Sequence, residues 1–444
     1  MKKVYFLISF ILISLGLNHF FYSDNLIDVV TNQPFKDGYL LFPSFRIFIE
    51  PFYAFAYHIL TMERSGYVFA LSSWIFWAIV LVVILSRYYK LKVGKTITYS
   101  LFAMFFVVSI ICSIILLPIA GPKLVVSKNY KVADIHSHSI SSKDNLSFVT
   151  SNINFHKKHG YTDFFITEHD NTNGYKSIPG NIKTDNIFPG IQIRTEGISV
   201  LLLSKVPFNY YDFKDKSIKE MVDLAHSKDM LVVVPHVWKW KKHSLQSLVD
   251  KGVDGFEVYN CGYRFLKPDK KQEIIQICKD NNLMMFGTTD WHGLGYMSNV
   301  WSLVYKDRKD SKKSFFDILK ENRPDVKVIV HDIKGNQSII RYIFEPFFAF
   351  YYYAVNTKVE YILSFYMILS LIILLFFKFK VQKVIKYISL IFALFFTVSL
   401  FYFTAMVLSF DFTFNVIIPE TIVPTAVSLI FIWIIIWWLC EKDI

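Results

Sequence analysis

Two histidines separated by one residue, His136 and His138, stand near the start of the only long polar region of this chain. Side chains on a β-strand point to the same face at every second residue, so both imidazole rings can reach one metal ion without distorting the backbone. Imidazole is a common ligand of transition metals. The spacing therefore predicts the first two ligands of a metal site.

The polar region, residues 126–333, has the sequence pattern of an α/β domain. Short runs of β-branched residues alternate with stretches of helical periodicity, which favours a largely parallel sheet or barrel. We expect strands at 132–136, 164–167, 191–193, 200–203, 231–234, 255–259, 284–287 and 326–330. We expect helices at 147–159, 216–228, 269–281 and 312–321.

Side chains that can bind a metal ion come at or just after the C-terminal ends of these strands. The strand ends of a barrel converge on one mouth, where barrel enzymes keep their chemistry. Packing alone does not readily explain five histidines at strand ends, so we expect one site with several ligands. The candidate ligands are His136, His138, Asp144, His169, His236, Asn260, Asp290 and His292.

Six short motifs occur in order along this region: Asp-Ile-His-Ser-His-Ser-Ile-Ser-Ser-Lys-Asp (134–144), Ile-Thr-Glu-His-Asp-Asn-Thr (166–172), Pro-Gly-Ile-Gln (189–192), Val-Pro-His (234–236), Gly-Phe-Glu-Val-Tyr-Asn (255–260) and Thr-Asp-Trp-His-Gly (289–293). Together they resemble the polymerase-and-histidinol-phosphatase (PHP) family of metal-dependent phosphoesterases. The resemblance covers residues 131–333 and none of the rest of the chain.

The resemblance implies a distorted (β/α)7 barrel that holds up to three divalent metal ions, Zn, Mn or Fe. It places the ligands in three groups, one around each ion. These groups are His136, His138 and Asp290 for one ion, His236 for a second, and Asp144, His169 and His292 for a third.

Gln192 is a departure from the family pattern, which usually has a metal-bridging glutamate at this place. A neutral amide supplies no charge to offset the repulsion between two cations, so it bridges them poorly. Either Glu196, four residues later, supplies the missing carboxylate, or the cluster holds fewer metals or none.

The reaction implied by these residues is metal-assisted hydrolysis of a phosphate ester. Bound metal ions lower the pKa of a water molecule, orient the phosphate and neutralise the charge that develops on its oxygens. Hydrolysis should depend on Asp290. His292, His169 or Arg194 could assist the leaving group or bind the phosphate, and the sequence does not decide between them.

The remainder of the chain has the composition of a polytopic membrane protein. Of all residues 53% are hydrophobic, 18% are aromatic, and the mean hydropathy is +0.36. Crossing a bilayer as a helix requires roughly 20 apolar residues. We therefore expect six spans, at 4–23, 65–86, 96–121, 361–377, 387–410 and 421–440.

Basic residues in short loops indicate how these spans are oriented. Lys and Arg are concentrated in the loop 87–95 and in the loop 378–386. Short loops rich in Lys and Arg stay in the cytoplasm. We therefore expect both termini in the cytoplasm and the polar domain outside it, as an integral protein of a bacterial-type plasma membrane.

Residues 46–60 and 341–355 form an internal repeat, with the same residue at seven of fifteen aligned positions. We expect interfacial helices at 42–60 and 338–355, in two all-α membrane halves, 1–122 and 338–444. Arg46 and Glu50 would meet on one helix face, since they are four residues apart. Either the segments anchor the chain in the outer leaflet, or they form a pocket for lipid head groups.

The sequence thus predicts an α/β barrel inserted between two transmembrane halves. The first hypothesis is a membrane-anchored phosphoesterase acting at the outer surface on a phosphorylated small molecule or a lipid-linked phosphate. The alternative is an inactive PHP-like module that binds metal or ligand as a sensor or scaffold. A transporter is disfavoured because the spans are almost free of charge. We expect contact with membrane lipids and no nucleic-acid partner.

Overall fold

The computed structural model divides into two compact units, which are described separately. It describes residues 2–21, 26–60, 66–88, 90–97, 99–100, 104, 107, 121–142, 145, 147–239, 243–261, 268–293, 299–306, 313–321, 323, 325–331 and 339–378. The barrel unit comprises Asp24–Pro43 and Ala120–Asp332. The helical unit comprises Met1–Ser23, Ser44–Ile119 and Ile333–Ile444.

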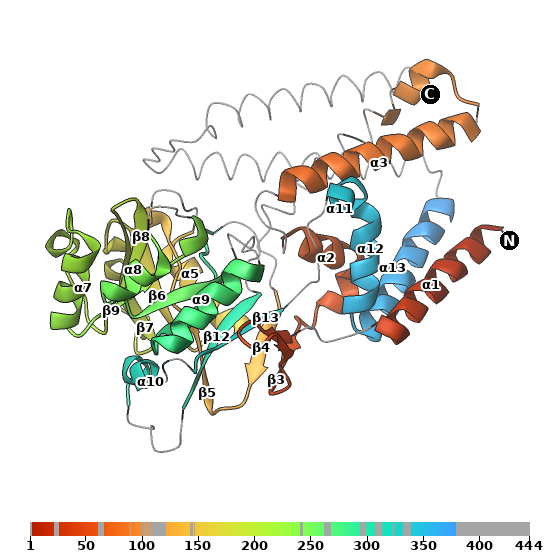
Figure 1. Cartoon of the computed structure of the whole chain (residues 1–444). Helices are drawn as coiled ribbons and strands as arrows, with labels where there is room; N and C mark the ends of the chain where they lie inside the picture. The colour runs from red at the N-terminus through yellow and green to blue at the C-terminus, as the bar shows by residue number, and fades with distance from the viewer. Residues whose placement is uncertain are drawn as a thin grey trace. The chain divides into compact units, whose positions relative to one another are not determined.

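Seven consecutive strands of the barrel unit lie side by side in chain order (Figure 1). They are β5 (Tyr130–Asp134), β6 (Asp163–His169), β7 (Ile187–Thr195), β8 (Ile198–Leu203), β9 (Leu231–Val234), β10 (Gly255–Asn260) and β11 (Met284–Thr288). A parallel bridge between Ser137 and Trp291 joins the two ends of this run just beyond β5 and β11. The seven strands therefore close into a ring at the mouth, in agreement with the barrel that the family resemblance implies.

One strand distinguishes this ring from a regular (β/α)7 barrel. β8 runs antiparallel to both its neighbours, β7 and β9, whereas β5 with β6, β6 with β7, β9 with β10 and β10 with β11 are parallel pairs. The reason is local, because only Glu196 and Gly197 separate β7 from β8. Both have positive φ, 47° and 82°, as a two-residue hairpin turn of the primed type requires.

The sheet continues beyond β5 through strands from both ends of the unit. β12 (Val300–Tyr305) pairs with β5, followed by β13 (Lys327–His331), β1 (Leu26–Asp28) and β2 (Gln33–Pro34). A separate two-stranded sheet joins β3 (Gly38–Leu41) to β4 (Lys123–Val126). Residues 24–43, which the sequence analysis assigns to the first membrane half, thus belong to the barrel unit, because β1 pairs with β13.

Helices of the barrel unit alternate with its strands. They are α5 (Val149–His159), α6 (Asn173–Lys176), α7 (Ile218–Ser227), α8 (Leu245–Asp250), α9 (Pro268–Asp280) and α10 (Phe315–Glu321), with 3-10 turns η1 (Ile140–Ser142), η2 (Tyr210–Asp212) and η3 (Val237–Lys239). The β8 residues Leu201, Leu202 and Leu203 are all buried, so both faces of this strand are covered. Such continuous apolar strands are typical of a sheet that is covered on both sides.

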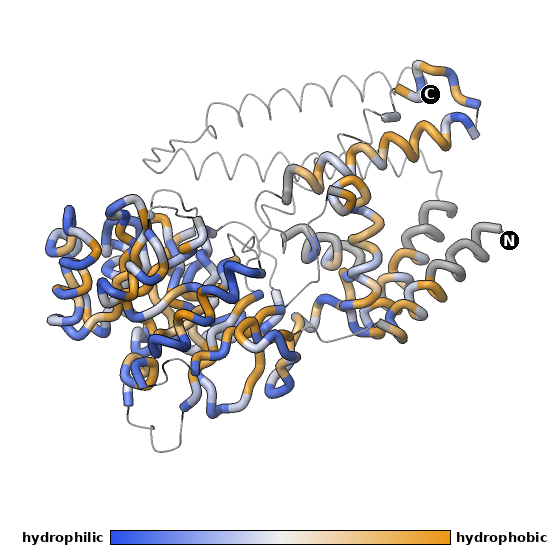
Figure 2. The backbone as a smooth tube through the Cα atoms, viewed as in Figure 1, coloured by the Kyte–Doolittle hydropathy of each residue, from blue (hydrophilic) through white to orange (hydrophobic). Residues whose placement is uncertain are grey.

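The helical unit contains the apolar segments of the chain that the structure describes. Its helices include α1 (Lys2–Phe21), α2 (Arg46–Leu60), α3 (Gly66–Tyr88), α11 (Ile339–Ile343), α12 (Glu345–Asn356) and α13 (Val359–Lys378). Among the described residues, one helix, Phe69–Tyr88, has the length and hydropathy to cross a bilayer; the apolar stretches Ile11–Phe20 and Val359–Leu371 are shorter. Figure 2 shows the apolar character along most of α3.

The expected spans have different outcomes. Those at 4–23, 65–86 and 361–377 coincide largely with the helices α1, α3 and α13. Most of the expected span 96–121, and all of those at 387–410 and 421–440, lie outside the described residues. The number of spans and their orientation therefore stay predictions from the sequence.

The two copies of the repeat are interrupted at the same place. The first copy is non-helical at Ile49, and the second breaks at Phe344, in each case directly before a Glu-Pro pair. Proline has no N–H to donate within a helix, so a break near it is expected. The expected pair of Arg46 with Glu50 is confirmed, with N–O distances of 2.6 and 2.8 Å.

The repeats also bond to each other in a reciprocal way. Nε2 of His58 in the first copy lies 2.5 Å from Oε1 of Glu345 in the second. Glu50 of the first copy forms a side-chain hydrogen bond with Tyr353 of the second. Each partner stands eight positions after the glutamate of its own copy, so the two contacts are equivalent under exchange of the copies, as in a two-fold interface.

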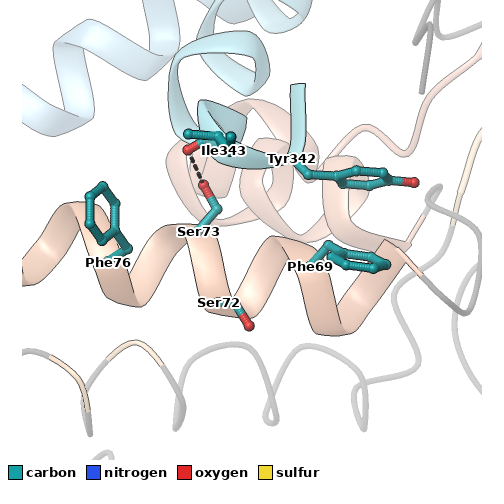
Figure 3. A pocket seen from close by; sticks show the side chains of 6 residues that line it. All are labelled: Phe69, Ser72, Ser73, Phe76, Tyr342 and Ile343. Atoms are coloured by element: carbon teal, nitrogen blue, oxygen red, sulfur yellow. Dashed lines mark hydrogen bonds between the residues drawn. The ribbon is translucent and has the colours of Figure 1, made fainter. Parts of the chain in front are cut away.

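The helices that follow the two copies also bond to the opposite copy. α3 follows the first copy, and its Ser73 and Trp77 donate hydrogen bonds of 2.9 and 2.8 Å to the carbonyl of Ile343 in the second copy. α13 follows the second copy, and its Ser364 donates to the carbonyl of Ile47 in the first. Figure 3 shows the Ser73 contact beside a groove of about 350 Å³ between α3 and α11.

Candidate metal centre

Two loops at the mouth of the ring carry the central ligand candidates. His136 and His138 follow β5, and Asp290 follows β11. Nε2 of His136 lies 3.3 Å from Oδ1 of Asp290, and Nε2 of His138 lies 3.2 Å from the same oxygen. All three side chains are buried. The structure therefore brings together the first group of ligands that the sequence suggests.

A buried aspartate fixes these two loops to each other. Asp134, the last residue of β5, accepts hydrogen bonds from the backbone N–H of His136 at 3.2 Å and from the hydroxyl of Thr289 at 2.5 Å. The N–H of Asp290 in turn donates to the carbonyl of His136 at 2.9 Å. Because Asp134 and Thr289 lie next to the ligand segments, these bonds set the distance between the two histidines and Asp290.

A second group of ligands adjoins the first and shares His138 with it. Ligand nitrogens of His138, His169 and His292 lie within 4.8 Å of one another. The ring of His138 is stacked on that of His169, with centroids 4.3 Å apart, and is 4.4 Å from that of His292. His169 and His292 are only partly buried, so this side of the centre is open to solvent. Asp144, expected in the same group, lies outside the described residues.

Gln192 lies between two histidines at the inner end of the centre. Its Oε1 is 3.2 Å from Nε2 of His136, and its Nε2 is 3.2 Å from Nε2 of His236. The amide thus occupies the position from which a bridging carboxylate would reach both rings.

Glu257 is a member of the site that the sequence reasoning did not select. Its buried carboxylate lies 2.7 Å from Nδ1 of His136 and accepts hydrogen bonds from the hydroxyl of Thr288 at 2.6 Å and from the backbone N–H of His236 at 2.7 Å. The side chain of Asn260 donates to it at 3.0 Å. Asn260 therefore lies beside the ligands and bonds to the carboxylate that holds them.

A β-bulge explains why Glu257 was missed. In a regular strand, residues 257 and 260 point to opposite faces. The register of β10 against β11 shifts between Glu257 and Tyr259, which places an extra residue in β10. The shift brings Glu257 and Asn260 to the same side. The motif Gly-Phe-Glu-Val-Tyr-Asn could have indicated the glutamate, but regular alternation could not.

Glu196 lies apart from the described ligand clusters, and Arg194 belongs to the same strand as Gln192. Glu196 occupies the β7–β8 turn, where its carboxylate is 2.7 Å from Nζ of Lys251 and accepts the N–H of Ile218 at 3.1 Å. The pair with Lys251 lowers the pKa of Glu196. Its place at the turn explains why it does not supply the carboxylate that Gln192 lacks. Arg194 is an exposed residue of β7, two positions beyond Gln192.

The charges of the central group are set by its own members. Burial works against a charged His136, but the carboxylates of Asp290 and Glu257 raise its pKa to about 9. Burial and the neighbouring His169 and His292 hold the pKa of His138 well below its usual range. Burial opposes the charge of Asp290 too, yet His136 and His292 keep its pKa well below the ordinary value. An anionic oxygen thus faces one protonated and one neutral imidazole.

This donor set fits a divalent metal ion. Nε2 of His138 is buried and has no hydrogen-bond partner among the described residues, although Oδ1 of Asp290 is near. A buried nitrogen of this kind is costly unless a ligand uses its lone pair. Two imidazole nitrogens and a carboxylate oxygen within 4.8 Å of one another suit Zn, Mn or Fe.

Comparisons with known proteins give similar structures only. No family model matches the chain, and no curated protein matches it. A two-domain protein from Bacteroides vulgatus, containing a predicted PHP-like metal-dependent phosphoesterase, is 20% identical with a TM-score of 0.35, over 49% of this chain and 69% of that one.

Two further structures are similar at the same level. A protein assigned as a metal-dependent phosphoesterase, from Bifidobacterium adolescentis, is 17% identical with a TM-score of 0.30, over 41% of this chain and 94% of that one. An amidohydrolase from Chromobacterium violaceum is 11% identical with a TM-score of 0.30, over 37% of this chain and 90% of that one. With such low identities and TM-scores, these similarities do not extend to the activity of this chain.

Proposed function

We propose that this chain is a metal-dependent phosphoesterase with a PHP-like barrel. The observation that carries the proposal is the pair of adjoining ligand groups, His136, His138 and Asp290 on one side and His138, His169 and His292 on the other. The order of the six sequence motifs supports the same reaction class. Because Nε2 of His138 can bind one ion only, the adjoining groups could hold two neighbouring ions if His138 serves one of them, an arrangement that two-metal phosphoesterases use.

The buried residues of the site and the partly exposed ones would have different roles. His136, His138 and Asp290 would hold one ion, and His169 and His292 would contribute to the site of another. Bound ions of this kind supply an activated water and neutralise the phosphate oxygens. His169 and His292 lie on the open side, and whichever of the two is not bound to an ion could give a proton to the leaving group. The exposed Arg194 offers a cation to the phosphate.

We further propose that the enzyme is anchored in a membrane and acts at its outer surface. The apolar helix Phe69–Tyr88 and the composition of the chain support the anchoring. The basic loops 87–95 and 378–386 support the orientation with both termini in the cytoplasm. The substrate class is a phosphorylated small molecule or a lipid-linked phosphate, since a tethered site favours esters at or near the membrane.

The decisive experiment uses the full-length protein in detergent. Its bound metals are counted, and phosphomonoesters and phosphodiesters are screened beside the variant Asp290→Ala. We expect stoichiometric metal and turnover in the wild type, and loss of both in the variant. Equal turnover of the two proteins would refute the assignment. For the orientation, a reporter that is active only in the cytoplasm is fused after residue 333. We expect this fusion to be inactive, and an active fusion would contradict the proposed orientation.

A second function is favoured by Gln192. Since an amide replaces the expected bridging carboxylate, the barrel could bind metal or ligand without turnover and serve as a sensor or scaffold of the membrane protein. Metal content together with the ester screen separates the two functions. Bound metal without hydrolysis of any ester would support the second.

A further inference from the structure

Ser142 makes three polar contacts at the inner side of the ligand groups. This buried residue ends the short turn η1, and its hydroxyl donates to Oε2 of Glu168. The same oxygen lies 3.0 Å from Nδ1 of His138 and 3.0 Å from the backbone nitrogen of His169. Neither Ser142 nor Glu168 was selected from the sequence.

The number of hydrogens at Ser142 determines how His138 is protonated. A serine hydroxyl has one hydrogen to donate, and here it is directed to the Glu168 carboxylate. The backbone N–H of His169 donates to the serine oxygen and needs no further hydrogen from it. The contact with His138 must then use a hydrogen carried by Nδ1. A neutral imidazole protonated at Nδ1 has its lone pair at Nε2.

Nε2 of His138 is the atom that faces the centre. It lies 3.2 Å from Oδ1 of Asp290, and His138 is the one residue common to both described ligand groups. Its tautomer and ring orientation therefore affect both groups at once. His136 also has an oxygen partner at its Nδ1, which lies 2.7 Å from Oε1 of Glu257.

We propose that Ser142, held by Glu168, is a positioning residue that fixes His138 with Nε2 directed to the metal. The inference rests on the metal centre of the proposed function and names a residue that acts through a ligand. A metal-binding histidine commonly donates its second N–H to an oxygen, and loss of that partner typically lowers metal affinity by about 10- to 100-fold.

Ser139 provides a matched control. It is buried like Ser142, and its hydroxyl also donates to the Glu168 carboxylate, at Oε1. No described contact joins the hydroxyl of Ser139 to the ring of His138. Removing either hydroxyl takes one hydrogen bond from Glu168, but only removal of Ser142 also takes the partner of Nδ1. A role limited to supporting Glu168 predicts equal effects of the two changes.

The experiment compares Ser142→Ala and Ser139→Ala in the full-length protein. Zn²⁺ affinity is measured by competition with a chromophoric chelator, and the absorption spectrum of the Co²⁺-loaded protein reports ligand geometry. We expect Ser142→Ala to weaken Zn²⁺ binding by about tenfold or more and to alter the Co²⁺ spectrum. Ser139→Ala should stay within about twofold of wild type. Ser142→Gly, which removes the hydroxyl without adding a metal ligand, provides a second variant if the alanine fails to fold.

The possible outcomes separate this inference from the proposed function. Equal losses in the two alanine variants, or an unchanged affinity in Ser142→Ala, would overturn the positioning role. Wild-type protein that binds Zn²⁺ but hydrolyses no ester would refute the hydrolase and leave the comparison of the variants valid. Wild-type protein that binds no Zn²⁺ or Co²⁺ would refute both.

Discussion

The side-chain nitrogen of Gln192 lies 3.2 Å from Nε2 of His236. An amide N–H directed at this atom uses the lone pair that a metal ion would need. The oxygen of the same amide is 3.2 Å from Nε2 of His136. Gln192 therefore connects the two rings by hydrogen bonds at the place where a carboxylate would connect two metal ions.

The variant Gln192→Glu should increase the amount of metal that the protein retains. A carboxylate brings a negative charge and two acceptor oxygens, which together offset the repulsion between two cations. We expect about one additional equivalent of metal per chain after exhaustive dialysis, measured by elemental analysis. Gln192→Leu, which removes the amide without adding charge, should gain none. Equal metal contents in Gln192→Glu and wild type would contradict this explanation.

Metal binding should depend on pH through His136. In the metal-free protein the pKa of His136 is raised to about 9, mainly by Asp290 and Glu257 acting against burial. Below that pH a metal ion must displace one proton, so the apparent affinity should rise by about tenfold per pH unit and level off above pH 9. Chelator competition between pH 6.5 and 9.5 tests this. An affinity that does not change over this range would contradict it.

Stability should fall in mild acid because of His159. Its Nδ1 lies 2.6 Å from the carbonyl of Phe155, and its Nε2 accepts the N–H of Gly121 at 3.2 Å. Burial lowers the pKa of His159 to about 3, whereas an unfolded histidine titrates near 6.5. The unfolded chain therefore binds the extra proton between these values, and the stabilising effect present above pH 6.5 is lost as the pH falls.

The variant His159→Gln isolates this contribution. At pH 7 the variant should be less stable than wild type, by about 1 to 3 kcal/mol for a lost buried hydrogen bond. The difference in unfolding free energy between wild type and variant should shrink by about 1.4 kcal/mol for each pH unit below 6.5. Thermal unfolding of the full chain in detergent, followed from pH 7 to pH 4, provides the measurement. A difference independent of pH would show that His159 does not titrate as described.

The crossed contacts of the repeat should appear as pairwise coupling. Glu345→Gln and His58→Gln each remove one member of a buried pair. The loss of unfolding free energy in the double variant should be smaller than the sum of the losses in the two single variants, by about 0.5 to 3 kcal/mol. The pair Glu50→Gln and Tyr353→Phe should show coupling of the same kind. The control combines His58→Gln with Tyr353→Phe, which belong to different pairs, and these should be additive. Coupling only in the control would exclude the reciprocal arrangement.

The sequence predicted those parts of the site that follow regular strand geometry. The expected strand 132–136 ends earlier, at Asp134, so His136 and His138 lie in the loop after β5, but both reach one site as their spacing predicted. The convergence of strand ends predicted that Asp290 lies near them. Glu257 was missed because the bulge in β10 breaks the alternation. Ser142 was missed because its contacts depend on a three-residue turn that no periodicity describes.

The fold was predictable to a similar extent. Buried runs such as 200–203 and 231–234 correctly indicated strands, because both faces of these strands are covered. The direction of β8 was not foreseen, because it depends on the positive φ of Glu196 in a two-residue turn. β1 and β2, of three and two residues, are too short to show alternation; β1 is defined by its pairing with the distant β13, and β2 by its pairing with β1.

The reciprocal bonds between the repeats also bear on how the protein is made. A ribosome completes α2 and α3 long before it reaches α12, since the residues joined by the contact of His58 with Glu345 are 287 positions apart. The barrel is translated in the interval. A nascent chain that stops after the barrel lacks both crossed contacts of the glutamates, as well as the backbone bonds from α3 and α13. Helices made after the barrel therefore complete contacts of helices made before it, and truncated products should be recognisable to quality-control proteases by an unfinished helical unit.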